Sequence, residues 1–283
     1  MSLAKFKGSR WFPVAVLLLS MVSIQSGAAL GKTMIPITGS SGITALRLSL
    51  GTIILFAIFK PWRLRFSREE RLPLIIYGLA LGAMNYSFYM AIKTVPLGIA
   101  VALEFCGPLT LALVGTRRVT DFIWIILAVA GLWFLLSVDR DVNSVDLKGA
   151  LLALTAGVFW AIYILAGPRA GAQHGPATVA VGSFIGMVIF VPPALIFASE
   201  SLWHLSVIPA GFAIALLSSA LPYSLEMIAL TRLPARVFGT LMSLEPGVAA
   251  LFGMILLGES LSLSQWLGLL AIVGASIGSA LTA

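Results

Sequence analysis

Apolar residues run along almost the whole chain in segments of about 17 to 24 residues, separated by short polar stretches. A helix of that length, rising 1.5 Å per residue, crosses a hydrocarbon core about 30 Å thick. The segments lack the alternation of apolar and polar residues over about ten positions that marks the strands of a membrane β-barrel. The pattern therefore predicts an all-α integral membrane protein.

We count ten such segments and expect each to be a transmembrane helix. They are residues 11–31, 43–59, 72–92, 97–115, 121–137, 148–166, 177–198, 208–230, 236–257 and 262–282. The longest polar stretches between them, 60–71 and 138–146, are too short to fold as a soluble domain. The function must therefore be carried out within the bilayer or across it.

Composition agrees with a membrane protein, and the charges indicate its orientation. Of the 283 residues 59% are hydrophobic and 10% are charged, whereas soluble domains carry about 25% charged residues. The net charge of +7 would suit a nucleic-acid partner, but lysine and arginine concentrate in alternate segments between the helices, as the positive-inside rule describes. With the N-terminus in the cytoplasm, 13 of them lie inside and four outside. We expect both termini in the cytoplasm, the lipid bilayer as the surroundings, and no nucleic-acid partner.

The N-terminus and the single cysteine narrow the class further. The start "KFKGSRW" leads into an apolar run longer than the roughly 7 to 15 residues of a signal peptide, so we expect a retained first helix. Cys106, within a predicted helix, is the only cysteine, which excludes an internal disulfide and argues against a cysteine-ligated metal. We expect no metal and no cofactor.

The second half of the chain resembles the first at a constant offset. Residues 89–109, "YMAIKTVPLGIAVALEFCGPL", align with residues 227–247, "MIALTRLPARVFGTLMSLEPG", at an offset of 138. Pro108 then falls on Pro246, each within a predicted helix. Internal similarity of this kind is typical of transporters built from two related halves.

We therefore predict two five-helix repeats, residues 1–137 and 148–283. Because five is odd, the second repeat enters the membrane from the opposite side and is inverted relative to the first. Two inverted bundles can rock against each other and expose a central site to either side in turn.

Four charged residues lie inside predicted helices, namely Glu104, Glu226, Glu245 and Arg47. An ionised group at a helix centre costs about 2.5 to 3.5 kcal/mol on insertion scales, so such groups usually face a cavity or a partner. Pro108 and Pro246 lack a backbone N–H and cannot form one helical hydrogen bond each. We therefore expect the helices that carry Glu104 and Glu245 to be broken at these prolines. Broken helices at matching places in two halves indicate a binding site. We expect the two glutamates to face each other across it; the alternative is two neutral acids bonded to neighbouring helices.

Each charged residue has a structural alternative to its proposed role. A carboxyl group at the site could hold an ammonium group or a proton in competition, so one of the two glutamates could couple transport to proton entry. Glu226 could form the inner mouth of the cavity or pair with Arg232 or Arg236. Arg47 could hold a substrate carboxylate through two hydrogen bonds, or extend outward to the membrane surface.

Further polar and aromatic residues complete the candidate cavity, although each could equally be ordinary packing. They are Gln25, Asn85, Tyr86, Tyr89, Trp160, Tyr163 and Tyr223, with Lys32 as a further buried charge. Four G-x-x-x-G pairs, starting at Gly27, Gly78, Gly182 and Gly274, predict close helix contacts within the bundle. Dimerisation through them is the alternative, so the choice between monomer and homodimer stays open.

Two other functional classes, an intramembrane hydrolase and a passive channel, find less support in the sequence than a transporter. The "GSSG" of residues 39–42 resembles the G-x-S-G of intramembrane serine proteases, but His174 lies on the opposite side of the predicted membrane from Ser41, and His204 lies in a loop. That chemistry needs a base within reach of the serine. The H-E-x-x-H and P-loop motifs are absent, and so are rings of like charge suited to a passive channel. A non-enzymatic secondary transporter is favoured over an intramembrane hydrolase and a channel.

Four stretches resemble the EamA branch of the drug/metabolite transporter superfamily, in particular its members that export threonine and homoserine. They are "FKPWRLRF", "MNYSFYMAIKTVPLGIAVALEFCGPL", "HGPATVAVGS" and "ALPYSLEMIALTRLPARVFGTLMSLEP". The resemblance, which covers residues 11–281, implies ten transmembrane helices in an inverted five-plus-five repeat, residence in the bacterial inner membrane, and efflux of small amino acids such as L-threonine and L-homoserine. Other members export other amino acids and metabolites, which is the alternative. The site residues rest on the physical argument alone.

Overall fold

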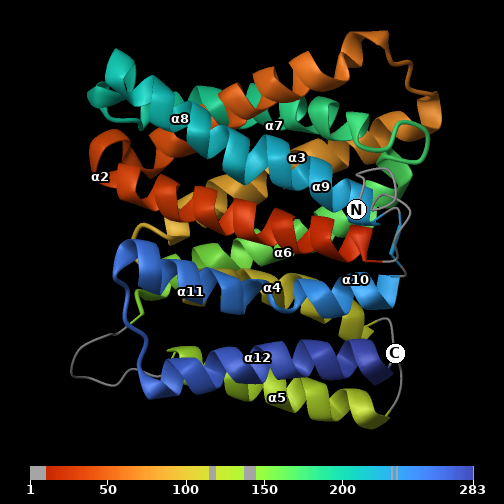
Figure 1. The fold of residues 1–283 in the computed structure, drawn as a ribbon, viewed down its shortest axis with the longest axis vertical. Coiled ribbons are helices and arrows are strands. Elements are labelled where there is room, and N and C mark those ends of the chain that lie inside the picture. The colour runs from red at the N-terminus through yellow and green to blue at the C-terminus, as the bar shows by residue number, and fades with distance from the viewer. Residues whose placement is uncertain (1–10, 115–118, 137–144, 231, 234, 283) are drawn as a thin grey trace.

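The computed structural model describes residues 11–114, 119–136, 145–230, 232–233 and 235–282. Within these ranges the regular secondary structure is helical, as an all-α fold requires, and the long helices lie alongside one another (Figure 1). They are α2 (Phe12–Phe59), α3 (Arg68–Ala91), α4 (Leu97–Val114), α5 (Val119–Leu136), α6 (Leu147–Ala170), α7 (Ala177–Ile196), α8 (Ile208–Ala215), α9 (Leu221–Leu230), α10 (Ala235–Met242), α11 (Glu245–Leu257) and α12 (Leu263–Thr282). Short turns complete them: η1 (Pro61–Arg63), η2 (Glu200–Trp203), η3 (Leu205–Val207) and the π-helical η4 (Leu216–Ala220).

Five helical segments are long and apolar enough to cross a membrane. They are Phe12–Phe59, Arg68–Ala91, Leu147–Ala170, Ala177–Ile196 and Leu205–Ala229. Four shorter apolar helices accompany them in the described part of the chain. The chain is therefore a helical membrane protein by length and composition, whereas the count of ten crossings stays a prediction.

The 48-residue α2 folds back on itself at Gly39, which adopts φ 73° and ψ 157°. That region of backbone space favours glycine. A Cβ added to Gly27 would lie 2.7 Å from the Ser218 backbone nitrogen, and one added to Gly51 would lie 3.1 Å from Ser219 Cβ. In a straight helix Gly27 and Gly51 would be about 36 Å apart, so α2 must consist of two arms, residues 12–38 and 40–59 (Figure 1).

This turn corrects the expectation of a loop between the first two predicted helices. Helix continues through most of residues 32–42, and only Gly39 leaves the helical region. The "GSSG" stretch is therefore the turn of α2. The Thr38 carbonyl beside it accepts a hydrogen bond from the Ser199 backbone N–H at 3.2 Å, which ties the turn to the end of α7.

The two proline-containing helices differ from each other. Residues 236–257 form two helices, because α10 ends at Met242 and α11 begins at Glu245. Pro246 stands in the first turn of α11, where a missing N–H leaves no helical bond unmade. By contrast α4 runs from Leu97 to Val114 with Pro108 inside it. The prediction that Pro108 breaks its helix is therefore wrong.

Packing against α6 accounts for the continuity of α4. A Cβ added to Gly157 would overlap the Glu104 carbonyl oxygen, and one added to Gly107 would overlap the Gly157 carbonyl oxygen. The two backbones are therefore in direct contact around the Glu104 carbonyl, to which Pro108 cannot donate a hydrogen bond. Such close contact, which the missing side chains of Gly107 and Gly157 permit, holds α4 in place although one helical hydrogen bond is missing.

Close glycine contacts also join α3 to α7, as the G-x-x-x-G pairs predict. A Cβ on Gly78 would lie 2.8 Å from the Gly182 carbonyl oxygen, and one on Gly82 would lie 2.9 Å from Gly186 Cα. At one edge of the bundle α5 lies beside α12, with Gly131 against Gly268 (Figure 1). These contacts are within the chain, so the G-x-x-x-G pairs at Gly78 and Gly182 serve the bundle.

Both ends of the described chain lie on one side of the bundle. The start of α2 and the end of α12 are at the same end, opposite the turn of α2 at Gly39 (Figure 1). At the Gly39 end Asp146 caps α6 by accepting from the Gly149 backbone N–H at 2.9 Å, and also from Thr94 Oγ1 at 2.7 Å. The Thr94 hydroxyl, followed by the Gly149 N–H, holds the pKa of Asp146 below its ordinary value.

Candidate functional site

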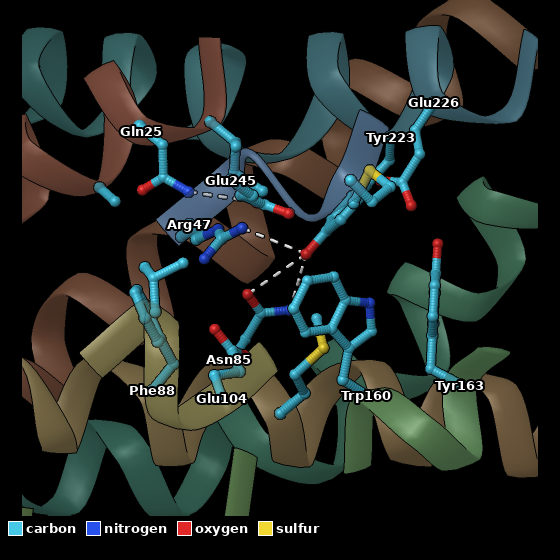
Figure 2. A pocket seen from close by; sticks show the side chains of 15 residues that line it. Gln25, Arg47, Asn85, Phe88, Glu104, Trp160, Tyr163, Tyr223, Glu226 and Glu245 are labelled. Carbon is cyan, nitrogen blue, oxygen red and sulfur yellow. Dashed lines mark hydrogen bonds between the residues drawn. The ribbon is translucent and has the colours of Figure 1, made fainter. Parts of the chain in front are cut away.

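A cavity in the centre of the bundle brings together side chains from seven helices, α2, α3, α4, α6, α9, α10 and α11 (Figure 2). The space open to the centre of a water molecule is about 40 Å³, enough for about three waters. The predicted site residues that line it are Gln25, Arg47, Asn85, Glu104, Trp160, Tyr163, Tyr223, Glu226 and Glu245. The structure therefore gathers Arg47, Glu104, Glu226 and Glu245 into one place, whereas Lys32 lies outside the cavity.

Arg47, on the second arm of α2, is held inside the bundle. Its Nε donates to Ser219 Oγ at 2.8 Å, and its Nη2 donates to the Ser218 carbonyl and to the Tyr223 hydroxyl. The guanidinium also lies over the rings of Tyr89 and Tyr223, with its carbon 5.3 and 5.9 Å from their centroids. The side chain is 3% exposed, so the alternative in which Arg47 extends to the membrane surface is wrong.

The π-helical turn η4 is what makes this anchorage possible. A π turn interrupts the regular spacing of helical hydrogen bonds. In η4 the Ser218 carbonyl and the Ser219 hydroxyl both bond Arg47, and the Leu217 carbonyl accepts from Ser23 Oγ at 2.6 Å. Polar groups of α2 thus satisfy the backbone at the interruption. Arg47 uses Nε and Nη2 in these bonds, and its Nη1 has no hydrogen bond to the described part of the protein.

Asn85 and Tyr223 meet in the middle of the cavity (Figure 2). The Asn85 amide nitrogen donates to the Leu81 carbonyl at 2.7 Å and lies 3.3 Å from the Tyr223 hydroxyl, to which it also donates. Tyr223 is therefore shared between Asn85 and Arg47. Asn85 belongs to α3 and Tyr223 belongs to α9, and these helices were predicted to lie in different repeats.

The three glutamates differ in their partners. Glu245, at the start of α11, accepts a hydrogen bond from Gln25 Nε2 at 3.1 Å, and its other carboxyl oxygen is buried without a partner among the residues that the structure describes. Glu104 and Glu226 form no hydrogen bond and no ion pair with any residue that the structure describes. Their carboxyl groups are thus available to a ligand in the cavity.

Of the two alternatives for Glu226, pairing with Arg232 is not observed. The Arg232 guanidinium lies over the Phe12 ring, 5.2 Å from its centroid, while Glu226 lines the cavity. The side chain of Arg236, the other candidate partner, lies outside the described residues.

Two aromatic candidates lie elsewhere. Tyr89 packs against Arg47, where its hydroxyl is buried and has no hydrogen-bond partner in the described part of the chain. Tyr86 lines a second, apolar cavity between α3, α6 and α7, with its ring 6.2 Å from that of Phe190. Successive helical residues point about 100° apart, so the face of α3 that carries Asn85 into the central cavity turns Tyr86 away from it.

Sequence reasoning missed the apolar part of the cavity wall. It consists of Ile24, Ala28, Met84, Phe88, Val101 and Met242. A signal was available for Phe88 and Met242, because the offset of 138 carries Phe88 onto Glu226 and Glu104 onto Met242.

Known proteins resemble the chain closely. It is 64% identical to the threonine/homoserine exporter RhtA of Salmonella typhimurium (strain SL1344) and equally to that of Escherichia coli (strain K12), in each case over 96% of this chain and 92% of the relative. The chain belongs to the EamA-like transporter family. The family model matches residues 147–281.

The fold is shared with a solved structure. One crystal structure superposes with a TM-score of 0.66 over 95% of this chain and 98% of the other, at 19% identity. That likeness concerns the fold alone. Since the family and its curated relatives are transporters, this EamA-like protein is a membrane transporter rather than an enzyme, and the hydrolase alternative is wrong.

Proposed function

We propose that this protein exports L-threonine and L-homoserine across the bacterial inner membrane by alternating access, with export coupled to proton entry. One observation carries the proposal: Arg47 and three carboxyl side chains share a buried cavity, and none of the four is ion-paired among the described residues. A zwitterionic amino acid presents a carboxylate and an ammonium group, and so suits a cavity with both charges. The curated relatives are threonine/homoserine exporters, which supplies the two substrates.

Each end of the substrate has a candidate partner. Arg47 Nη1 is open to a substrate carboxylate, while Nε and Nη2 fix the guanidinium in place. Glu104, which lacks a partner, would hold the ammonium group, assisted by Glu245. Glu226 lines the same cavity and offers a third carboxyl group.

The size of the cavity favours a small substrate. Room for about three waters argues against a bulky substrate, and the large side chains of Phe88 and Trp160 line the cavity on the side of α3 and α6. Among amino acids of this size, a side-chain hydroxyl would find acceptors in the unpaired carboxyl groups.

Coupling to protons follows from competition for a carboxyl group. A buried carboxylate that has released an ammonium group must either find another cation or take up a proton. A proton arriving from outside would therefore replace the substrate and be carried inward. The excess of three carboxyl groups over one guanidinium provides a place for that proton.

For the topology we propose ten crossings with both termini in the cytoplasm. The crossings are the two arms of α2, α3, α4, α5, α6, α7, the run from α8 through α9, the pair α10 and α11, and α12. An even number agrees with the start of α2 and the end of α12 lying at one end of the bundle (Figure 1). Residues 1–137 and 148–283 would be the two inverted repeats.

The cavity supports the repeat. Four pairs of its lining residues are separated by 138 positions, the offset that aligns the two halves: Gln25 and Tyr163, Asn85 and Tyr223, Phe88 and Glu226, and Glu104 and Met242. The Asn85 side chain is hydrogen-bonded to its own counterpart, Tyr223. Equivalent residues of two repeats touch only near the axis that relates them, so this axis would pass through the cavity.

The decisive experiment measures flux of radiolabelled threonine and homoserine in proteoliposomes, with and without a pH gradient. We expect accumulation against a concentration gradient when a pH gradient is imposed. Flux that does not depend on the pH gradient would exclude proton coupling but would still show that the protein transports these amino acids. Failure to move either amino acid would sink the substrate assignment and leave another amino acid or metabolite as cargo.

Single substitutions assign the roles. Glu245→Gln protein whose threonine efflux still responds fully to the pH gradient would exclude Glu245 as the proton carrier. The same measurement on Glu104→Gln tests the other candidate, and the exposed Glu69→Gln on α3 serves as the control for both.

A further inference from the structure

An ion pair joins Lys32 to Glu259 at the end of the bundle where α2 turns. Lys32 Nζ lies 2.6 Å from Glu259 Oε1, and the two side chains are 19% and 15% exposed. Lys32 is on the first arm of α2, and Glu259 follows α11. It is an ion pair between residues 227 positions apart in the sequence, and neither residue belongs to the central cavity.

Backbone groups complete the partners of both charges. Lys32 Nζ also donates to the Val95 carbonyl at 2.6 Å, and Glu259 Oε2 accepts from the Leu97 backbone N–H at 2.8 Å. A charge taken out of water is tolerated when such partners surround it. We call Lys32, Glu259 and the backbone of Val95 and Leu97 the clamp. It ties α2, the start of α4 and the end of α11 together.

The local sequence directs Glu259 to this position. Gly258 ends α11 with φ 65°, a conformation that favours glycine, and the Glu259 backbone N–H turns back to the Gly253 carbonyl at 3.1 Å. A Cβ at Gly253 would overlap Glu259 Oε2. The carboxylate therefore lies across the end of α11, in space that a larger residue would fill.

The clamp lies about one helical turn beyond the central cavity on two of its helices. Ala28 lines the cavity one helical turn before Lys32, and Val101 lines it one turn after Leu97. The third helix, α11, starts in the cavity at Glu245 and ends at the clamp. Between cavity and clamp α4 packs directly on α11, because a Cβ on Gly98 would lie 2.7 Å from Ala250 Cα.

We propose that the clamp is the lock that holds the transporter closed on its periplasmic side. This inference rests on the proposed function, which supplies alternating access and places the Gly39 end of the bundle outside. Lys32 and Leu97 belong to the first proposed repeat, and Glu259 belongs to the second. Opening the outer face separates the repeats at this end, so the ion pair and the Leu97 bond must break before substrate leaves.

The first test joins the two positions covalently. Cys106 is the only native cysteine, so Cys106→Ala gives a cysteine-free background. In it Lys32→Cys and Glu259→Cys are linked by a flexible bifunctional methanethiosulfonate. Linked protein should lose export, and reduction of the link should restore it. The two single-cysteine variants treated with the same reagent are the controls. Export that persists in fully linked protein overturns the proposal.

The second test needs no substrate. Ala28→Cys places a thiol in the cavity, where a membrane-impermeant maleimide added from the periplasmic side reports opening of the outer face. With Lys32→Ala or Glu259→Gln the labelling rate should rise about 5- to 150-fold, the usual range for coupling energies of this kind. Lys93→Ala removes an exposed lysine at the same end and should leave the rate unchanged.

The outcomes separate this inference from the proposed function. Labelling that rises only when the clamp is broken supports the lock even if neither threonine nor homoserine is carried. Equal labelling in the Lys32→Ala and Lys93→Ala proteins overturns the lock even if both amino acids are carried.

Discussion

The contact between Gly27 and η4 gives a prediction that links packing to the site. A Cβ at Gly27 would lie 2.7 Å from both the backbone nitrogen and the Cβ of Ser218. Ordinary contact begins at 3.4 Å, so Gly27→Ala must push η4 and the first arm of α2 apart by about 0.7 Å. Overpacking of this kind costs about 1 to 3 kcal/mol.

The displacement reaches Arg47 through the serines of η4. Arg47 Nε lies 2.8 Å from Ser219 Oγ, and a movement of about 0.7 Å brings that distance near 3.5 Å, where a hydrogen bond is essentially lost. We therefore expect Gly27→Ala to lower stability and also to raise the KM for threonine, because the guanidinium is no longer fixed.

Gly167 on α6 is the matched control. Its added Cβ would lie 3.7 Å from Tyr77, an ordinary contact, so Gly167→Ala brings no overpacking. Both substitutions gain about 1 kcal/mol of helix propensity, so the difference between the two variants isolates the packing cost of about 1 to 3 kcal/mol. Thermal unfolding in detergent and initial rates in proteoliposomes measure the two effects. Equal stability and equal KM in the two variants would refute the close approach of η4 to α2.

Three further substitutions test the cavity. Arg47→Lys keeps the charge but loses the planar donors, so the KM for threonine should rise at least about tenfold while transport of threoninol, which lacks the carboxylate, changes little; an equal effect on both compounds would exclude Arg47 as the carboxylate partner. Glu104→Gln should abolish concentrative export and Glu69→Gln should not, and a functional Glu104→Gln protein would move the ammonium site to another acid. Tyr223→Phe removes the hydroxyl shared by Arg47 and Asn85 and should slow threonine transport, whereas Tyr86→Phe, in the second cavity, should be neutral; the reverse order would place the site in the second cavity.

The hydrophobic pattern was sufficient to predict where the helices lie but not where they are interrupted. Burial of long apolar stretches in a bilayer requires helices whatever the tertiary contacts, so the segments 148–166 and 177–198 correspond to α6 and α7 within a few residues. Interruptions depend on neighbours instead. Gly39 turns the chain because α2 can fold back onto η4, and Pro108 leaves α4 intact because Gly157 packs against it.

The candidate site was predicted best where a residue is costly in hydrocarbon. Arg47, Glu104, Glu226 and Glu245 have few places to go in a membrane protein other than a shared cavity, and they lie in one. Aromatic residues carry no such constraint, since they pack equally well anywhere in the bundle. The sequence therefore could not separate Tyr223, in the cavity, from Tyr86, outside it.

The hydrogen bond between Asn85 and Tyr223 has a consequence for how such a site could arise. Two identical repeats would place the same side chain on both sides of their axis and would treat the two ends of a bound molecule alike. An amino acid has unlike ends, so recognition of its direction requires the copies to differ where they meet. Around this cavity they do: the amide of Asn85 meets the phenol of Tyr223, and the carboxyl group of Glu104 corresponds to a thioether at Met242. Under the proposed repeat, divergence at these few positions converts a symmetric scaffold into one that can tell an amine from an acid.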